Sequence, residues 1–518
     1  MFLFGNIRDH KGLPARICSV ILSFSLKEEK IPERFMENPS QKRLTLSSEM
    51  DAGASVDRIS SLPDSVLCHI LSFLPTTKYA VGTSILSKRW KFLWTGVPYL
   101  LFDDDRFHKS PERVRKFEQF VNKVLLLSTV QNILKFRLCG NEFIEPFYVN
   151  AWISTAIIRN VRVLKVQVFY YCRADVVIEL PSCLFTCRTL EDLELWDNLD
   201  INTPNLVCLP RLKRLTLSDV QYRNDESVSK LISGCPILEF LDICRCSFDN
   251  VTVFVISSPS LKQLRFRGPD DFPENLHYKV AINTPALESL DYSNHIWQHI
   301  GVNFQNITSL VRAKIDVETF PGDDPPQSAF CNSLVELVQA LHGVKILTLS
   351  QKTMNALSYA TTCLSTRRFE GLTKLVVGAG CCEWTCLQDL VEAAVNLEVL
   401  DFTKVGNLDA FDMLKNWHRE HTIESCWRDP IEVPRCLITS LKQISLEELE
   451  GCEDELAMIG YILKHGSVLN RMHLSSKVGG LSTKFQLTQK ILLFPRRSPT
   501  CQIAFCRQAG PRSLFSKS

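Results

Sequence analysis

The sequence lacks several features that would place it in a simple class. No apolar run approaches the roughly 20 residues that span a bilayer, so no transmembrane helix is predicted. Charge of one sign is not in excess, because 59 Lys and Arg against 57 Asp and Glu leave a net charge of +2. This balance argues against wholesale electrostatic binding of nucleic acid. With 45% hydrophobic and 22% charged residues, the composition is that of an ordinary soluble protein.

Cysteine is too scarce for a disulfide scaffold. The 20 cysteines are about 4% of the 518 residues, below the roughly 8–10% of such scaffolds. Several lie in apolar runs and predict buried free thiols in a reducing compartment: Cys187, Cys208, Cys244 and Cys363. Neither the close pairs, such as Cys244 and Cys246, nor the cluster of Cys381, Cys382 and Cys386 is followed by a second pair at zinc-site spacing. No metal site and no cofactor are therefore predicted.

Signatures of catalysis are also missing. The chain contains no G-x-S-x-G, P-loop or H-E-x-x-H motif. Cys68 and His69 are adjacent in a predicted helix, where neighbouring side chains diverge rather than form a nucleophile–base pair. No catalytic residue is predicted, and an enzymatic activity of this chain is not expected.

Residues 1–55 form an ambiguous leader. The short apolar run 17–24 follows three basic residues, which is the charge order of a secretory signal. However, the run contains two serines, and no small-residue cleavage site follows it. We therefore expect a disordered leader. Met36 and Met50 are alternative starts, so the leader need not be translated.

Residues 56–102 predict a compact helical module. Apolar residues at three- and four-residue steps, after Pro63 and before Pro75, predict one amphipathic helix. Two further short helices are expected over 78–86 and 88–94, the last capped by Ser87. So small a module with so much apolar surface is typical of a protein-binding unit. An ordinary N-terminal cap is the alternative.

The run Ile59–Pro75, followed by Ser87-Lys-Arg-Trp90 and Leu93-Trp94, resembles the F-box of plant F-box/leucine-rich-repeat proteins. The resemblance implies docking to a Skp-type adaptor, and through it to cullin and RING subunits. It also implies candidates for the adaptor face or its immediate support: Leu62, Pro63, Val66, Leu67, Ile70, Leu71, Leu86, Trp90 and Leu93. The sequence does not separate these two roles. Lys88 and Arg89 are expected to be solvated rather than to make specific contacts.

An irregular L-x-x-L-x-L repeat recurs from about residue 130 to residue 415. Its copies begin at Ile133, Val161, Leu190, Leu212, Leu238, Leu261, Leu287, Leu310, Val344, Leu372 and Leu397. Most spacings fall within the 20–29 residues of a leucine-rich repeat. The L-x-L spacing predicts a strand, and stacked repeats form a curved parallel sheet. The expected fold is therefore α/β: a small helical F-box, then a leucine-rich-repeat solenoid over 112–415.

The positions between the strand leucines are expected to project from the concave face of this sheet. Six of them are candidates for binding a target protein: Glu194, Trp196, Asp242, Arg265, Arg267 and Asp291. Mixed charges with an aromatic side chain suit a protein partner better than a phosphate backbone. Most of this face is nonetheless expected to be solvated surface.

Residues 421–505 predict a terminal cap. Two more repeat copies begin at Leu441 and Leu469, and a helical stripe between them ends before Gly466, a predicted C-cap. The segment resembles the FBD domain that follows the repeats in many plant F-box proteins. The resemblance rests on Trp427, Pro430, Val433–Leu437, Gly451, Glu455, Tyr461–Leu463 and Phe494–Cys501. Its biochemical role is not implied, and 506–518 is expected to be a tail.

These resemblances imply a substrate receptor of an SCF-type E3 ubiquitin ligase that holds an unknown target protein for ubiquitination. No nucleic acid or membrane partner is expected, and the expected location is the nucleus, the cytoplasm or both. A non-degradative protein-binding scaffold is the alternative. A small ligand that assists target binding also stays open.

Overall fold

The computed structural model describes 59, 61–103, 111–140, 143–169, 177–197, 199–245, 251–268, 279–296, 301–319, 328–378, 384–403, 427–476 and 481–505. The predicted leader and tail, Cys246, Cys381 and Cys382 lie outside these residues. The chain divides into two compact units, Met1–Val168 and Phe169–Ser518. No helix of the described residues is long and apolar enough to cross a membrane.

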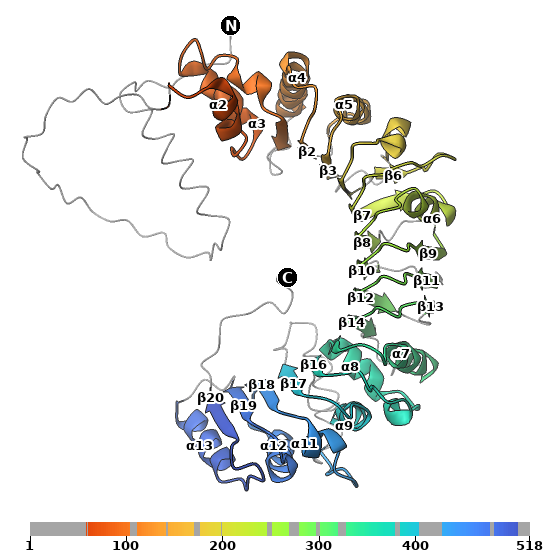
Figure 1. Ribbon diagram of the computed structural model, residues 1–518, viewed down its shortest axis with the longest axis vertical. Helices are drawn as coiled ribbons and strands as arrows, with labels where there is room; N and C mark the ends of the chain where they lie inside the picture. Colours follow the sequence, from red (N-terminus) through yellow and green to blue (C-terminus); the bar gives the residue numbers. More distant parts are fainter. Residues whose placement is uncertain are drawn as a thin grey trace, which may run out of the picture. The chain divides into compact units, whose positions relative to one another are not determined.

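The first unit combines a helical module with a parallel sheet (Figure 1). Its elements are α2 (Asp64–Leu71), α3 (Thr77–Gly82), η1 (Thr83–Ile85), η2 (Leu93–Gly96), β1 (Tyr99–Asp103), α4 (Pro111–Leu127), β2 (Lys135–Gly140), α5 (Pro146–Ile158) and β3 (Val163–Val168). Strand β2 pairs in parallel with both β1 and β3. Helices α4 and α5 connect these strands, as crossovers between parallel strands require.

The first predicted helix forms, but the third does not. Pro63 is the N-cap of α2, which ends at Leu71, and α3 continues into η1. The predicted helix over 88–94 is wrong: residues 88–92 form turns, and only Leu93–Gly96 is a 3-10 helix. So short a segment has little helical stability of its own, so packing decides its backbone. Trp90 and Trp94 are both buried, and the Trp94 indole donates to the Lys91 carbonyl at 3.2 Å.

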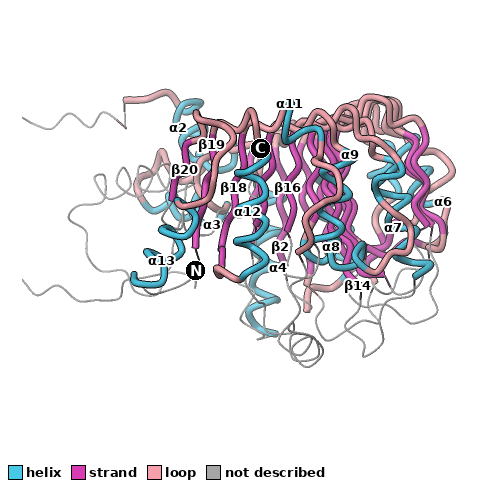
Figure 2. Tube along the Cα trace, turned by 90° about the horizontal axis from the view of Figure 1, so that it is seen from below, coloured by secondary structure: helices cyan, strands magenta, loops and turns pink. Residues whose placement is uncertain are grey.

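The second unit is built on a long run of parallel strands (Figures 1 and 2). Its main sheet contains β5 (Asp192–Trp196), β7 (Arg214–Tyr222), β8 (Phe240–Arg245), β10 (Gln263–Arg267), β12 (Ser289–Ile296), β14 (Arg312–Thr319), β15 (Ile346–Leu349), β16 (Lys374–Gly378), β17 (Val399–Thr403), β18 (Gln443–Leu449), β19 (Arg471–Ser476) and β20 (Gln502–Phe505). Each strand pairs in parallel with the next in this order.

The repeat leucines explain this sheet. The first leucine of each copy precedes a strand, and the other two lie in it, with their side chains buried. Equivalent residues are paired in register, as in Leu193 with Leu215 and Leu215 with Leu241. Each repeat thus buries its apolar face against its neighbours, which is why the sheet extends repeat by repeat. The predicted leucine-rich-repeat architecture is confirmed.

The repeat leucines point toward one face of the main sheet. The segments that connect its strands cover this face in two ways. Short strands cover part of it: β9 (Val253–Ser257), β11 (Lys279–Asn283) and β13 (Gly301–Gln305) form a second parallel sheet, and β6 (Leu199–Ile201) pairs with β4 (Ile178–Glu179) and β7. Helices cover the rest: η3 (Ser182–Thr186), α6 (Glu226–Ser233), α7 (Ser328–Ala340), α8 (Gln351–Ser358), η4 (Leu364–Thr366), α9 (Trp384–Ala393), α11 (Arg435–Thr439), α12 (Glu453–His465) and α13 (Leu481–Leu492). In the part of the chain that the structure describes, no helix lies on the opposite face of the main sheet, which is called the helix-free face below.

The last three strands continue the repeats, as the expected cap requires. Helix α12 connects β18 to β19, and α13 connects β19 to β20. Acidic residues begin α12, and Lys464 and His465 end it, which complements the helix dipole. Gly466 is the C-cap, as predicted, but its φ is −69°. A Cβ there would approach the Ile462 carbonyl oxygen to 2.8 Å, so close packing rather than a left-handed backbone requires glycine.

The described cysteines include thirteen free thiols. Burial was predicted for four of these cysteines, and the prediction holds fully for only one. Cys187 is buried, Cys208 and Cys244 are half-buried, and Cys363 is exposed. Cys244 occupies an outward position of β8, and Cys363 lies in the loop before η4. An apolar stretch of sequence therefore does not bury every residue in it, because alternate strand positions face opposite sides.

Candidate protein-binding surfaces

The nine F-box candidates divide into core and surface. Four of them are buried and hold the module together: Leu67, Leu71, Trp90 and Leu93. Leu62, Ile70 and Leu86 are half-buried, while Pro63 and Val66 are exposed. The buried residues therefore support a surface from behind, and the other five can touch a partner.

A second apolar row lies beside the buried one. Val66, Ile70 and Phe73 follow the i, i+4, i+7 spacing of a single helix side, and Phe73 follows the end of α2 with 60% of its surface exposed. The buried row is offset by one residue and consists of Leu67 and Leu71. The sequence prediction did not separate the residues of the two rows, and it did not include Phe73.

Three further exposed side chains of the module were not predicted. Tyr79, Ile85 and Phe92 lie on α3, on η1 and just before η2, each with more than half of its surface exposed. The only signal in the sequence is that they fall outside the apolar periodicity of the core. Together with Val66 and Phe73 they give this small module five exposed large apolar side chains, which is typical of a protein-binding unit.

Arg89 makes specific contacts at the N-terminal end of α2, contrary to the expectation that it is simply solvated. Its guanidinium donates to the Asp64 carboxylate at 2.9 Å from Nε and 2.6 Å from Nη2, and also to the Leu62 carbonyl. The turn over 88–92 is thereby joined to the Leu62-Pro63 segment. Lys88 is exposed, as expected.

Cys68 and His69 do not form a catalytic pair. The Cys68 thiol donates to the Leu93 carbonyl at 3.2 Å, whereas the His69 ring packs edge-on against Phe73. Burial raises the pKa of Cys68, and the nearby Asp64 carboxylate raises it further. The thiol is therefore protonated at neutral pH and serves as a structural donor, which confirms the predicted divergence of the two side chains.

The helix-free face of the second unit carries a row of alternating charges. Asp242, Arg265, Asp291 and Lys314 are register partners on the neighbouring strands β8, β10, β12 and β14. Arg265 lies 3.3 Å from Asp242 and 3.6 Å from Asp291, and Lys314 lies 3.2 Å from Asp291. The structure thus brings together three of the predicted candidates and adds Lys314, which its position in the repeat pattern could have identified.

Asp242 is the anchor of this row. Its side chain is only 9% exposed, and a second guanidinium, that of Arg267, lies 3.1 Å from it. The neighbouring Asp242 carboxylate outweighs burial and raises the pKa of Arg267. The two arginines are nearly half-exposed, so they remain available to a partner while Asp242 fixes their positions.

The remaining two candidates lie on β5, two strands from Asp242. Glu194 occupies the register row of Asp242, and Trp196 the row of Arg267. Both are half-buried. At roughly 4.8 Å between strands they lie about 10 Å from the charge cluster, within reach of one bound protein segment.

The FBD motif residues have local structural roles. Trp427 contacts Trp384 of α9 and Tyr461 of α12 edge-on, each with ring centroids 5.9 Å apart, and its backbone N–H donates to Asp454 at 2.9 Å. The Glu455 carboxylate accepts the N–H groups of Glu450 and Gly451 at 3.0 and 2.6 Å. Gly451 has φ +80°, so the turn before α12 favours glycine.

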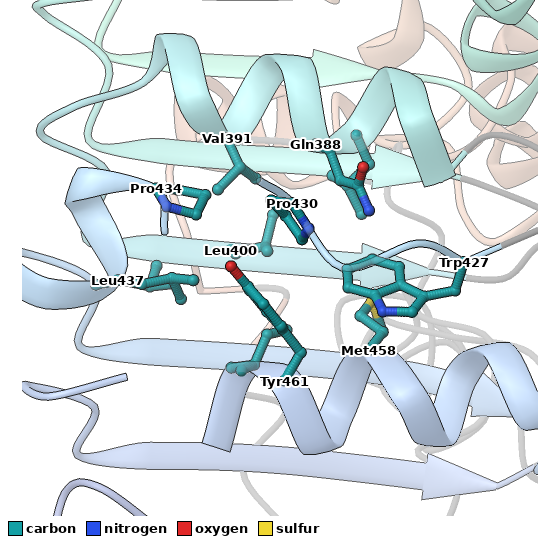
Figure 3. Close-up of a pocket in the computed structure, with 12 residues that line it drawn as sticks. Gln388, Val391, Leu400, Trp427, Pro430, Pro434, Leu437, Met458 and Tyr461 are labelled. Atoms are coloured by element: carbon teal, nitrogen blue, oxygen red, sulfur yellow. The ribbon is translucent and has the colours of Figure 1, made fainter. Parts of the chain in front are cut away.

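A small apolar hollow lies where α9, α11 and α12 meet (Figure 3). Val391, Leu400, Trp427, Pro430 and Tyr461 are among its lining residues. Its cavity volume is about 40 Å³, far below the roughly 300 Å³ of the smaller small-molecule sites. The hollow has no room for a ligand of drug size, so the possibility of a ligand-assisted receptor gains no support from it.

Comparison with known proteins agrees with these features. Family models match the F-box domain at residues 59–102, the LRR repeats of FBD-associated F-box protein At5g56370 at 149–310, and FBD at 429–474. Two curated proteins of Arabidopsis thaliana are similar over most of the chain. Probable FBD-associated F-box protein At1g32375 is 31% identical, covering 87% of this chain and 100% of its own. F-box/FBD/LRR-repeat protein At5g56420 is 32% identical, covering 87% and 99%.

Proteins with these domains are typically non-catalytic adaptors, and an F-box domain implies binding to a Skp-type adaptor in general. The family models and the exposed module surface thus agree. The chain belongs to the plant family of FBD-associated F-box proteins with leucine-rich repeats.

Proposed function

We propose that this chain is a substrate receptor of an SCF-type E3 ubiquitin ligase. The F-box would bind a Skp-type adaptor, and the helix-free face of the repeats would hold the target protein. The row of Val66, Ile70 and Phe73 is the observation that carries the proposal, because exposed apolar side chains beside a complete core call for a partner. The family architecture, which in general suggests an SCF-type substrate adaptor, gives it further support.

In this proposal the chain contributes position rather than chemistry. The adaptor, a cullin and a RING subunit would bring a charged ubiquitin-conjugating enzyme close to a lysine of the bound target. Holding both together raises their effective concentration, so no nucleophile or base from this chain is needed. The mixed charges around Asp242 would orient the target.

The nucleus, the cytoplasm or both would be the place of this activity. The free thiols of the described cysteines are compatible with a reducing compartment. Location is part of the proposal, and a fluorescent fusion of the full chain would test it.

Co-purification with a plant Skp-type adaptor tests the docking step. The full chain is co-expressed with the adaptor as wild type, as Val66→Glu and as Leu62→Ala/Pro63→Ala. We expect both variants to lose at least tenfold in adaptor capture, because the first places a charge in the exposed row and the second removes apolar contacts just before it. Phe147→Glu is the matched control: Phe147 is 76% exposed but lies on α5, outside the module.

Equal capture of Val66→Glu and wild type would exclude this surface as the docking site. If no Skp-type adaptor paralogue is captured by soluble, folded wild type, the non-degradative scaffold becomes the better description. If the adaptor is captured, reconstitution with cullin, RING subunit and conjugating enzyme distinguishes the two roles. A receptor supports ubiquitination of a protein held on the repeats, and a scaffold does not.

A further inference from the structure

The net charge of the chain is close to zero, but acidic and basic residues are distributed unevenly along the sequence. All 57 acidic residues lie at or before Glu455, together with 49 of the 59 basic residues. The last 63 residues contain ten Lys and Arg and no Asp or Glu. This stretch includes most of α12 and all of β19, α13 and β20. The terminal part of the FBD segment is therefore strongly basic, although the whole chain is not.

Five cations of this region have no carboxylate partner in the part of the chain that the structure describes. Lys464, Arg471, Lys490, Arg496 and Arg497 are exposed, and among the described residues none of them forms an ion pair. Backbone contacts bring four of them to one place. The Arg497 N–H donates to the Leu463 carbonyl at 3.0 Å, and the Gln502 N–H to the Asn470 carbonyl at 2.9 Å. The loop after α13 therefore lies beside Lys464 and Arg471.

The same layer also exposes apolar side chains. Phe485, Gln489, Leu492 and Leu493 follow the i, i+4, i+7, i+8 spacing of one helix side, which is opposite the buried Leu487 and Ile491. Phe485 is 62% exposed and Leu493 84%. Solenoid ends are normally covered by polar capping repeats, so an apolar stripe on α13, the last helix of the described residues, is unusual.

Strand β20 adds a third feature. It pairs with β19, and among the described residues no strand pairs with its other edge. Phe505 at its end is 40% exposed. An open strand edge offers main-chain donors and acceptors that a polypeptide can pair with in register.

Four candidate occupants can be compared by charge. The chain's own residues 506–518 carry three basic residues and no acid, so they are repelled by this layer. A second copy that pairs through the same layer brings the same positive charges against it. Nucleic acid would neutralise the cations but leave Leu492 and Leu493 uncovered, and it cannot use a strand edge. An acidic polypeptide with apolar side chains matches all three features.

We propose that the terminal layer formed by α13, the loop after it and β20 binds an acidic, amphipathic segment of a partner protein. The cations attract its carboxylates, and the stripe of Phe485, Leu492 and Leu493 receives its apolar side chains. This interaction is separate from the F-box and from the repeat face, so the FBD segment supplies a second protein-binding site.

Fluorescence anisotropy with the full chain tests this proposal. The probe is a labelled twelve-residue peptide of alternating Glu and Leu, compared with the same peptide carrying Lys in place of Glu. We expect the acidic peptide to bind at least tenfold more tightly, with an affinity that falls as salt is raised. Arg496→Glu/Arg497→Glu should weaken it at least tenfold, and so should Leu492→Ser/Leu493→Ser.

The matched control is Arg312→Glu/Lys345→Glu, which makes the same change in net charge at exposed repeat positions. Its affinity should stay within twofold of wild type. If both charge variants lose the same affinity for the acidic peptide, net charge alone explains the binding, and the proposed site is overturned. A DNA duplex, or vesicles of phosphatidylcholine and phosphatidylserine, binding more tightly than the peptide would overturn the choice of partner. Adaptor capture reports separately on the F-box, so the two proposals fail independently.

Discussion

Val66 and Leu67 are neighbours in the sequence but face opposite environments: Leu67 is completely buried, and Val66 keeps 40% of its surface exposed. Both lie on α2, where consecutive side chains point about 100° apart. Leu67 therefore belongs to the core of the F-box module, and Val66 belongs to its exposed surface.

Substitution of these two residues should give opposite phenotypes. Leu67→Ala should destabilise the module by about 2–5 kcal/mol, because it leaves a cavity in a thin core. Val66→Ala should cost less than about 1 kcal/mol but weaken adaptor capture. Hydrogen exchange of the α2 amides measures the first effect, and co-purification measures the second. Faster exchange in Val66→Ala than in Leu67→Ala would contradict the assignment.

Much of the fold could be predicted from the sequence, because equivalent leucines of successive repeats mark the strand residues that pair. Each L-x-L pair marks a strand, and equal spacing leaves only a parallel stack. The third helix of the F-box module could not be predicted. Its segment is too short for propensity to decide, and its turns depend on Arg89 reaching Asp64, 25 residues away.

The site was predictable to a smaller extent. Outward strand positions follow from the two-residue period, so the candidates at Asp242, Arg265 and Asp291 were identified correctly as neighbours on one face. What periodicity cannot give is burial. Asp242 is nearly buried because two arginines cover it, whereas Cys363, which was expected to be buried, is exposed.

Buried thiols predict a loss of stability at alkaline pH. Burial raises the pKa of Cys436 to about 12. The folded chain keeps a proton that the unfolded chain releases above a pH of about 8.5–9, so the free energy of unfolding falls as the pH rises from about 9 to 12. Cys436→Ala should lose less stability between pH 8 and pH 10.5 than wild type, as measured by urea unfolding. Equal losses in the two proteins would contradict this.

Alkylation with iodoacetamide gives an independent check on the same thiols. At pH 8, peptide mapping should find Cys363 modified before the other cysteines that the structure describes, because it is exposed. Cys436 and Cys235 should react only on unfolding, since burial raises the pKa of Cys235 to about 12 as well. Rapid modification of Cys436 in the folded chain would show that this site opens locally.

The turn before α12 should depend on Glu455. Its carboxylate is buried and accepts the N–H groups of Glu450 and Gly451, so Glu455→Ala removes the acceptor of two backbone donors in a partly buried turn. We expect a loss of about 2–4 kcal/mol in the free energy of unfolding. Glu455→Gln keeps one acceptor oxygen and should lose less. Proteolysis of the 450–455 turn should accelerate in the same order, and an alanine variant as resistant as wild type would refute this role.

Asp242 should matter more to stability than an exposed ion pair does. Asp242→Asn removes the charge that holds Arg265 and Arg267 together on β10. Because Asp242 is nearly buried but both arginines are nearly half-exposed, we expect a loss of about 1–3 kcal/mol rather than the full cost of a buried pair. Glu398→Gln is the control: its 3.0 Å pair with Lys442 is about half-exposed at both ends and should contribute less than about 1 kcal/mol. Urea unfolding followed by tryptophan fluorescence compares the two variants. If both lose the same stability, Asp242 is no anchor, and the charge row would be ordinary solvated surface.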